Sequence, residues 1–278
     1  MRSNLVLACV GDESLHPGWL SGRGRRSFDL FLVYYGDRRG RYREQCEHYR
    51  QAKGTKWELI SEALRGGLEL EDYRAVWLPD DDLRADLHTV NRLFRVFQRF
   101  GLHLAQPALE RDSYVSHDIT LRRPFWRLRY TTFVEIMAPL FSREALSLLR
   151  HSFGMNRTGW GLDYYWYDRL RAAGLDKMAV IDSAAVTHTR RTDPRGGYYG
   201  RMAIDPNAEF EQLVERFALE PRQGVTGVVL PPGLPSRRLP PPSKLAERLL
   251  GFPGRIGARL TARLRRLAHK ALTGVPRR

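Results

Sequence analysis

Three consecutive aspartates, Asp80, Asp81 and Asp82, are the residues whose type and spacing most clearly indicate chemistry. They follow residues 73–78 (YRAVWL), an apolar run that predicts a buried strand ending at Pro79. Adjacent carboxylates repel one another, and a fold tolerates that repulsion mainly when a cation or several hydrogen-bond donors neutralise it. Hard oxygen ligands of this kind suit Mg²⁺ or Mn²⁺, which connects one or two carboxylates to the phosphates of a substrate. We therefore predict a metal and phosphate site; the alternative is a polar turn near a helix start.

Two further polar residues stand at positions where catalytic groups occur. His188 comes after the last predicted strand, residues 178–181, and Asp163 lies in the first turn of a predicted helix at residues 162–173. A single His after a strand is commonly a surface or core residue, and an Asp in a first turn is common because it interacts favourably with the helix dipole. Neither residue indicates a site on its own.

The predicted loop at residues 110–129 is rich in arginine, interleaved with aromatic residues. Such a loop can bind anionic or sugar groups by bidentate hydrogen bonds and stacking, although a solvated loop explains it equally well. Glu135 lies in an apolar run at residues 131–140 that predicts a strand. Because carboxylates are almost never buried unpaired, Glu135 should face a site or pair with one of these arginines. The arginines are Arg122, Arg123, Arg127 and Arg129.

The elements that would position these residues alternate between strand and helix patterns. Predicted strands lie at residues 5–10, 28–35, 73–78, 103–108 and 178–181, and predicted helices at residues 56–68, 87–101, 142–151 and 162–173. This alternation predicts an α/β sheet that is largely parallel and flanked by helices. The polar loop at residues 11–26 follows the first strand, where ligands commonly bind in such sheets.

Charge is distributed very unevenly along the chain. Of the net charge of +15, +12 lies in residues 221–278, which hold 13 Lys or Arg and one acid. Residues 230–242 contain six prolines, which predicts a linker, and the apolar and basic residues beyond them keep helical spacing. We therefore predict an α/β catalytic domain at residues 1–220, a Pro-rich linker at 221–242 and a basic amphipathic tail at 243–278.

The tail suits an anionic membrane surface, with residues 243–272 making the contact. A disordered tail, a helix for a partner protein and nucleic-acid contact are the alternatives, and the nearly balanced charge of residues 1–220 argues against a nucleic-acid groove there. The apolar run at residues 5–10 is too short for a signal peptide core or a membrane span. With two unpatterned cysteines, these features predict a cytoplasmic protein, peripheral on the inner face of the membrane.

Several sequence blocks, taken in order, resemble the domain-of-unknown-function 707 family over residues 3–200. These blocks are GDESLH (11–16), FDLFLVYYGD (28–37), KGTKWELI (53–60), DDDL (80–83), QPAL (106–109), HDITLRR (117–123), FVEIMAPLFSREAL (133–146), GWGLD (159–163) and VIDSAAVTH (180–188). That family resembles GT-A type glycosyltransferases, which have a Rossmann-like fold and an Asp-x-Asp metal motif after a central strand.

The resemblance implies roles for individual residues. Asp80 and Asp82 match the Asp-x-Asp pair that holds Mn²⁺ or Mg²⁺ against a nucleotide diphosphate, and His188 matches a further metal ligand. Asp163 matches the base that deprotonates the acceptor hydroxyl in inverting members. Nucleotide-sugar contacts and an acceptor or substrate loop complete the expected site: Gly11, Asp12, Glu13, Asp37, Lys56 and Asp81 for the first, and Arg122, Arg123, Glu135 and Trp160 for the second.

The sequence thus predicts a metal-dependent glycosyltransferase that moves a sugar from a nucleotide-sugar donor to an acceptor such as a surface polysaccharide or glycolipid. One alternative is an Mg²⁺-dependent nucleotidyl- or phosphotransferase, since carboxylate clusters serve phosphoryl chemistry equally well. The other is a non-catalytic protein that binds carbohydrate or polyanions. Neither the donor, the acceptor nor the stereochemistry can be read from the sequence pattern.

Overall fold

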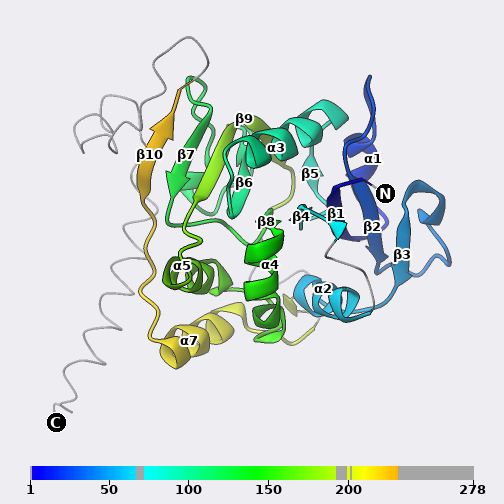
Figure 1. Ribbon diagram of the computed structural model, residues 1–278. Coiled ribbons are helices and arrows are strands. Elements are labelled where there is room, and N and C mark those ends of the chain that lie inside the picture. The colour runs from blue at the N-terminus through cyan, green and yellow to red at the C-terminus, as the bar shows by residue number, and fades with distance from the viewer. Residues whose placement is uncertain (1, 67–71, 192–198, 201, 231–278) are drawn as a thin grey trace.

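The computed structural model describes residues 2–66, 72–191, 199–200 and 202–230. Its centre is a ten-stranded mixed sheet with the strand order β10-β7-β9-β6-β8-β4-β1-β2-β3, and β5 pairs with the end of β9 (Figure 1). The strands are β1 (Asn4–Val10), β2 (Asp29–Tyr34), β3 (His48–Gln51), β4 (Ala75–Trp77), β5 (Leu83–Arg84), β6 (Leu104–Leu109), β7 (Leu128–Thr131), β8 (Leu140–Ser142), β9 (Met178–His188) and β10 (Val225–Val229).

Helices cover both faces of this sheet (Figure 1). The helices are α1 (His16–Trp19), α2 (Lys56–Arg65), α3 (Leu87–Arg99), α4 (Arg143–Leu149), α5 (Leu162–Ala172) and α7 (Pro206–Phe217), with 3-10 turns η1 (Arg43–Gln45), η3 (Asp118–Thr120) and η4 (Arg150–Gly154). No helix in the described ranges is long and apolar enough to cross a membrane.

Most strands of the sheet run in the same direction. β1 is parallel to β2 and β4, β2 is parallel to β3, and β6 is parallel to β9. β8 lies antiparallel between β4 and β6, so those two strands also share a direction. The carboxyl ends of β1, β4 and β9 therefore lie at the same edge of the sheet. The prediction of a largely parallel α/β sheet flanked by helices is confirmed.

Two apolar cores lie on opposite faces of the sheet, because successive side chains of a strand point to opposite sides. Leu5 and Leu7 of β1 pack in one core with α2, α4 and α5, whereas Val6 and Ala8 pack in the other with α1 and α3. Asp86 caps the N-terminus of α3, since its side chain accepts a hydrogen bond from the Thr89 N–H at 2.7 Å.

The structure corrects three boundaries predicted from the sequence. Residues 132–139 are not a strand but a buried loop between β7 and β8, so Glu135 lies in a loop. β9 does not end before Asp182 but continues to His188. β10 lies within the predicted linker at residues 221–242 and pairs with β7, so the folded domain continues past residue 220. The proline run at 231–242 and the tail at 243–278 lie outside the described residues.

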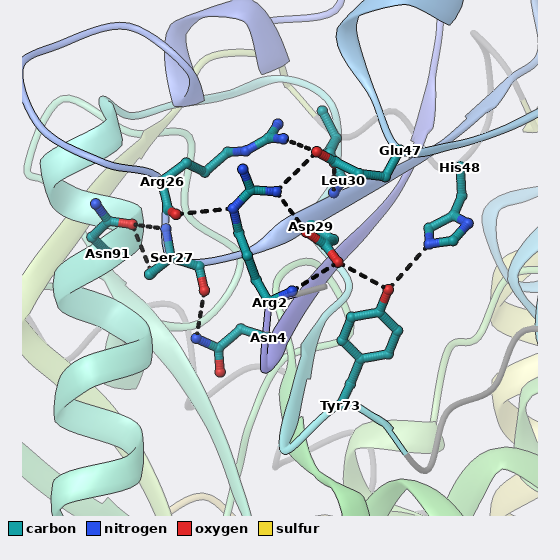
Figure 2. Close-up of polar contacts among 10 residues, drawn as sticks. All are labelled: Arg2, Asn4, Arg26, Ser27, Asp29, Leu30, Glu47, His48, Tyr73 and Asn91. Carbon is teal, nitrogen blue, oxygen red and sulfur yellow. Dashed lines mark hydrogen bonds and ion pairs between the residues drawn. The ribbon is translucent and has the colours of Figure 1, made fainter.

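A polar network closes the edge of the sheet where β1 and β2 begin (Figure 2). Asp29 is 2% exposed and accepts hydrogen bonds from the Arg2 guanidinium at 2.7 Å and the Tyr73 hydroxyl at 3.3 Å. Glu47 binds both Arg2 and Arg26, and its second oxygen accepts the Leu30 N–H at 2.8 Å. This edge of the sheet is therefore held by structural ion pairs.

Candidate active site

The aspartate run begins three residues after β4, at the edge of the sheet where strand carboxyl ends meet. Lys56, the first residue of α2, lies over it: its ammonium group donates to Asp80 Oδ1 at 2.6 Å and to the carbonyls of Ile136 and Met137 at 2.8 and 2.9 Å. Burial raises the pKa of the Asp80 carboxyl, and the charge of Lys56 opposes that rise. Lys56 thus joins α2, the aspartate run and the loop at residues 132–139.

Asp81 organises the neighbouring backbone. Its Oδ2 accepts the Gly11 N–H at 2.8 Å and the Tyr35 hydroxyl at 3.2 Å, and its Oδ1 lies 3.4 Å from Arg190 Nη1. Burial raises the pKa of Asp81 to about 6, against the hydrogen bond from Gly11 and the charge of Arg190. Both oxygens are engaged by the protein, so Asp81 holds the loop after β1 in place.

Asp82 pairs with His188 at the end of β9. His188 Nε2 lies 3.3 Å from Asp82 Oδ2, and His188 Nδ1 donates to the Tyr114 carbonyl at 2.7 Å. Burial acts to lower the pKa of His188, but the hydrogen bond and charge of Asp82, the Tyr114 carbonyl and the charge of Asp80 outweigh it and raise that pKa to about 9. The imidazole is therefore protonated at neutral pH.

Two adjoining cavities open on the aspartate run. The first, the Lys56 cavity, has a volume of about 200 Å³ and is bordered by Lys56, Tyr35, Arg157 and the start of α2. The second, the Asp163 cavity, has a volume of about 360 Å³ and extends from Asp80 to the start of α5. Asp80, Ile136 and Tyr199 border both cavities, so the two volumes meet at the first carboxylate.

The Asp163 cavity encloses two buried carboxylic acids. Burial raises the pKa of Asp163 to about 8, with the charge of Glu135 adding to the rise and the Tyr164 N–H opposing it. Burial also raises the pKa of Glu135 to about 7, and its Oε2 is buried without a hydrogen-bond partner among the described residues. Glu135 therefore faces the cavity and does not pair with the arginine-rich loop. Groups with such pKa values can exchange protons near neutral pH.

The aspartate run fits a divalent cation in its chemistry but not yet in its arrangement. Asp82 Oδ1 is buried and has no hydrogen-bond partner in the described ranges, which leaves a hard oxygen ligand available. Within those same ranges, however, no three His, Cys, Asp or Glu side chains are grouped as a metal site. Asp80 binds Lys56, and a protonated His188 cannot act as a ligand. Asp82 offers an oxygen directly, whereas Asp80 would first have to release Lys56 and His188 would first have to lose its proton.

The structure brings together some of the predicted residues and separates others. Asp80, Asp82, Lys56, Glu135, Trp160, Asp163 and His188 all border one cavity or both. Asp12, Glu13 and Asp37 border neither: Asp12 accepts the Tyr34 hydroxyl at 2.8 Å, and the side chains of Glu13 and Asp37 are 89% and 93% exposed. Arg122 and Arg123 also lie away from both cavities, and Arg122 binds Glu110 at 2.5 Å.

Several residues that border the cavities were missed by sequence reasoning. Arg157 borders the Lys56 cavity and binds Glu58 at 2.7 Å, and His117 and Tyr164 border the Asp163 cavity. Gln223, from the segment predicted as linker, lies 3.0 Å from the Tyr164 hydroxyl. The sequence signal was that His117 is the first residue of the block HDITLRR and Arg157 lies two residues before GWGLD; their spacing alone indicates no chemistry.

The fold is similar to that of solved protein structures. Residues 1–349 of S. aureus TarS, in complex with UDP-GlcNAc, give a TM-score of 0.51 at 10% identity, over 78% of this chain and 66% of that chain. Glucosyl-3-phosphoglycerate synthase from Mycobacterium tuberculosis, in complex with Mn²⁺, UDP and glucosyl-3-phosphoglycerate, gives 0.49 at 14% identity, over 87% and 88% of the two chains. At such identities the TarS likeness is one of fold, and it supports the predicted Rossmann-like, GT-A type architecture.

No curated protein matches this chain. Its sequence does match a family profile, that of the protein of unknown function (DUF707), over residues 25–197. These bounds lie inside the region where the sequence blocks resemble that family, and they contain the aspartate run, both buried acids and His188. Because the match spans well over half of the chain, the protein belongs to the DUF707 family.

Proposed function

We propose that this protein is a metal-dependent glycosyltransferase that moves a sugar from a nucleotide-sugar donor to an acceptor hydroxyl. One observation carries the proposal: a cavity bordered by Lys56, Arg157 and the three aspartates meets a cavity with two buried acids at Asp80. A direct displacement needs such an arrangement, because the anionic leaving group and the deprotonated nucleophile lie on opposite sides of the transferred group.

The Lys56 cavity suits the diphosphate of the donor. Lys56 and Arg157 supply positive charge, and the first turn of α2 borders the same space. A helix N-terminus favours phosphate through its unpaired N–H groups and its dipole. Asp80 and Asp82 would hold Mn²⁺ or Mg²⁺, with His188 as a third ligand once deprotonated. The metal, when bound, would offset charge that develops on the departing diphosphate.

The Asp163 cavity suits the acceptor. In the proposed reaction the acceptor oxygen bonds to the anomeric carbon, the bond from that carbon to the diphosphate breaks, and the hydroxyl proton passes to the Asp163 carboxylate. The pKa of about 8 for Asp163 makes it a strong base once ionised. A direct displacement with this base inverts the anomeric carbon, whereas a retaining route follows if Asp163 does not face the acceptor. Glu135 and Trp160 border the same space and would contact the acceptor.

The test is calorimetric titration of a panel of nucleotide sugars, with and without Mn²⁺, and of nucleoside triphosphates. We expect metal-dependent binding of one donor that disappears in the double variant Asp80→Asn, Asp82→Asn. Asp37→Asn is the matched control, because that carboxylate is 93% exposed and borders neither cavity. Asp163→Asn should bind the donor normally but transfer or hydrolyse it about 10² to 10⁴ times more slowly.

Each alternative predicts a different result. Binding of nucleoside triphosphates in place of nucleotide sugars would favour a nucleotidyl- or phosphotransferase. A folded protein that binds no member of either panel would refute the enzyme proposal and favour a non-catalytic binding protein.

We also propose, from the sequence, that the protein acts in the cytoplasm and reaches an anionic inner membrane surface through residues 243–272. A lipid-linked or surface glycan acceptor would fit this location. Flotation with anionic vesicles tests it: the intact chain should float, and a chain ending at residue 230 should not.

A further inference from the structure

A third cavity, of about 430 Å³, lies between α3 and the loop that precedes β7. It is bordered by Arg92 and Arg95 of α3 and by Arg122, Trp126 and Arg127 of the loop. It shares no lining residue with the Lys56 and Asp163 cavities. Asp182, which borders it, precedes His188 by six residues of β9. We call this space the arginine cavity.

The helical spacing of α3 gathers positive charge on one side of this cavity. Arg92, Arg95 and Arg99 are three and four residues apart, which places them on one face of the helix. Like charges at this spacing destabilise a helix. Arg127 joins them from the loop, where its N–H donates to the Val229 carbonyl at 2.8 Å and its carbonyl accepts the Ser183 N–H at 3.0 Å.

The nearby carboxylates do not neutralise this charge. Asp182 forms a buried ion pair with Arg129 at 3.0 Å and accepts the Arg123 N–H at 2.7 Å, so its charge is already compensated. Within the described part of the chain, no carboxylate forms an ion pair with the three remaining arginines of the cavity, which are Arg92, Arg95 and Arg127.

Two further observations show uncompensated polar groups in the cavity. The pKa of Arg127 is lowered, first by burial and then by the charges of Arg99, Arg92 and Arg95. Ser183 Oγ is buried without a hydrogen-bond partner among the described residues, and Ser183 borders the cavity. An anion with several acceptor oxygens would relieve the repulsion and bind the hydroxyl.

We propose that the arginine cavity is a phosphate-binding site separate from the candidate active site. Arginine guanidinium groups bind phosphate oxygens through paired, charge-assisted hydrogen bonds. Trp126 borders the cavity, and Phe125, the residue before it in the chain, is 80% exposed and available to an apolar group attached to the phosphate. The shared ligand chemistry is a phosphate ester, carried either by a small soluble molecule or by a lipid headgroup.

The experiment uses the full chain in EDTA, which removes divalent metal ions and so prevents metal-dependent binding of the donor. Inorganic pyrophosphate is titrated calorimetrically, and monomeric short-chain phosphatidylglycerol is titrated beside short-chain phosphatidylcholine. The test variant is Arg95→Gln with Arg127→Gln, and the control with the same charge change is Arg150→Gln with Arg171→Gln. The effect of Phe125→Ser on the binding of each probe distinguishes a soluble phosphate from a lipid headgroup.

We expect a 1:1 complex that the test variant weakens on the order of tenfold or more and the control leaves within twofold. If pyrophosphate binds and Phe125→Ser has no effect, the ligand is a soluble phosphate; if phosphatidylglycerol binds better than phosphatidylcholine and Phe125→Ser weakens it, the ligand is a lipid headgroup. The proposal is overturned if neither probe binds, or if the test variant binds both as tightly as the control.

Discussion

The buried ion pair between Arg129 and Asp182 offers a quantitative test of how the sheet is held together. Their side chains are 1% and 0% exposed, and Arg129 also donates to the carbonyls of Ile119 and Leu121 at 2.8 Å each. Replacing Arg129 with Met removes the partner of a buried carboxylate and two further hydrogen bonds. Breaking such a pair typically costs about 3 to 5 kcal/mol, because the remaining charge stays buried.

The structure places the expected cost toward the lower end of that range. Asp182 keeps the N–H of Arg123 at 2.7 Å, and burial already raises its pKa, so it can take up a proton when Arg129 is lost. A carboxyl with a raised folded pKa destabilises the protein above its unfolded pKa, and that penalty shrinks as the pH falls. The variant should therefore lose about 3 kcal/mol at pH 7 and less at pH 5.

Urea unfolding followed by circular dichroism measures this cost. With a slope of about 2 to 3 kcal/mol per molar urea, a loss of 3 kcal/mol lowers the midpoint by about 1 to 1.5 M. Arg171→Met removes an exposed arginine and should change the free energy of unfolding by no more than about 0.5 kcal/mol. The double variant Arg129→Met, Asp182→Leu should be more stable than Arg129→Met alone, because no charge stays buried.

Two results would refute this reasoning. One is a cost below about 1 kcal/mol for Arg129→Met at pH 7 with an unchanged slope. The other is a double variant less stable than the single one, which would show that the carboxylate contributes without its partner.

The remaining predictions concern a glycine and an acid. Gly159 has a φ of +78°, and a Cβ there would lie 2.1 Å from Trp57 Nε1. Gly159→Ala should therefore lower the free energy of unfolding by more than about 2 kcal/mol in urea titrations. An unchanged urea midpoint would contradict the left-handed backbone and the close contact at residue 159. Burial acts to raise the pKa of Asp29, but hydrogen bonds and charge from Arg2 and a hydrogen bond from Tyr73 lower it below 3.8. The ionised carboxylate therefore stabilises the folded protein above pH 3.8, and this stabilisation is lost as the pH falls below that value. The destabilisation by Asp29→Asn should therefore be larger at pH 7 than at pH 3 in thermal unfolding, and equal costs at the two pH values would contradict it.

The sequence was sufficient to locate helices and strands where the local hydrophobic pattern and the burial of the residues agree. β1, α3 and α5 lie where their apolar periodicity or composition placed them. The same rule failed at residues 132–139, which are apolar because they lie beneath the site. Their backbone groups bind other loops and a side chain: the Pro139 carbonyl accepts the Leu78 N–H at 2.9 Å, and the Ile136 carbonyl accepts the Lys56 ammonium at 2.8 Å. No hydrophobic pattern distinguishes such a buried loop from a strand.

Partners that are distant in the sequence explain the other failures. Asp182 appeared to end a strand because a charge is unexpected in a core, but Arg129, 53 residues earlier, makes the position tolerable. For the site, residue types identified the aspartate run, yet they did not show that Asp81 binds Gly11 across 70 residues. Predicted donor contacts at Asp12, Glu13 and Asp37 lie on loops whose direction depends on tertiary packing.

Lys56 gives the candidate active site its own counter-ion. Its ammonium group lies 2.6 Å from Asp80 Oδ1, Arg190 lies 3.4 Å from Asp81 Oδ1, and His188 lies 3.3 Å from Asp82 Oδ2, so each of the three clustered carboxylates has a cationic partner in the same chain. These internal ion pairs predict that the domain folds without a bound metal, so a chelator should leave the melting temperature unchanged. A cation that binds here must compete with Lys56 for Asp80, and a phosphate must compete with Asp80 for Lys56. The affinity of either ligand therefore depends on where the Lys56 ammonium can move.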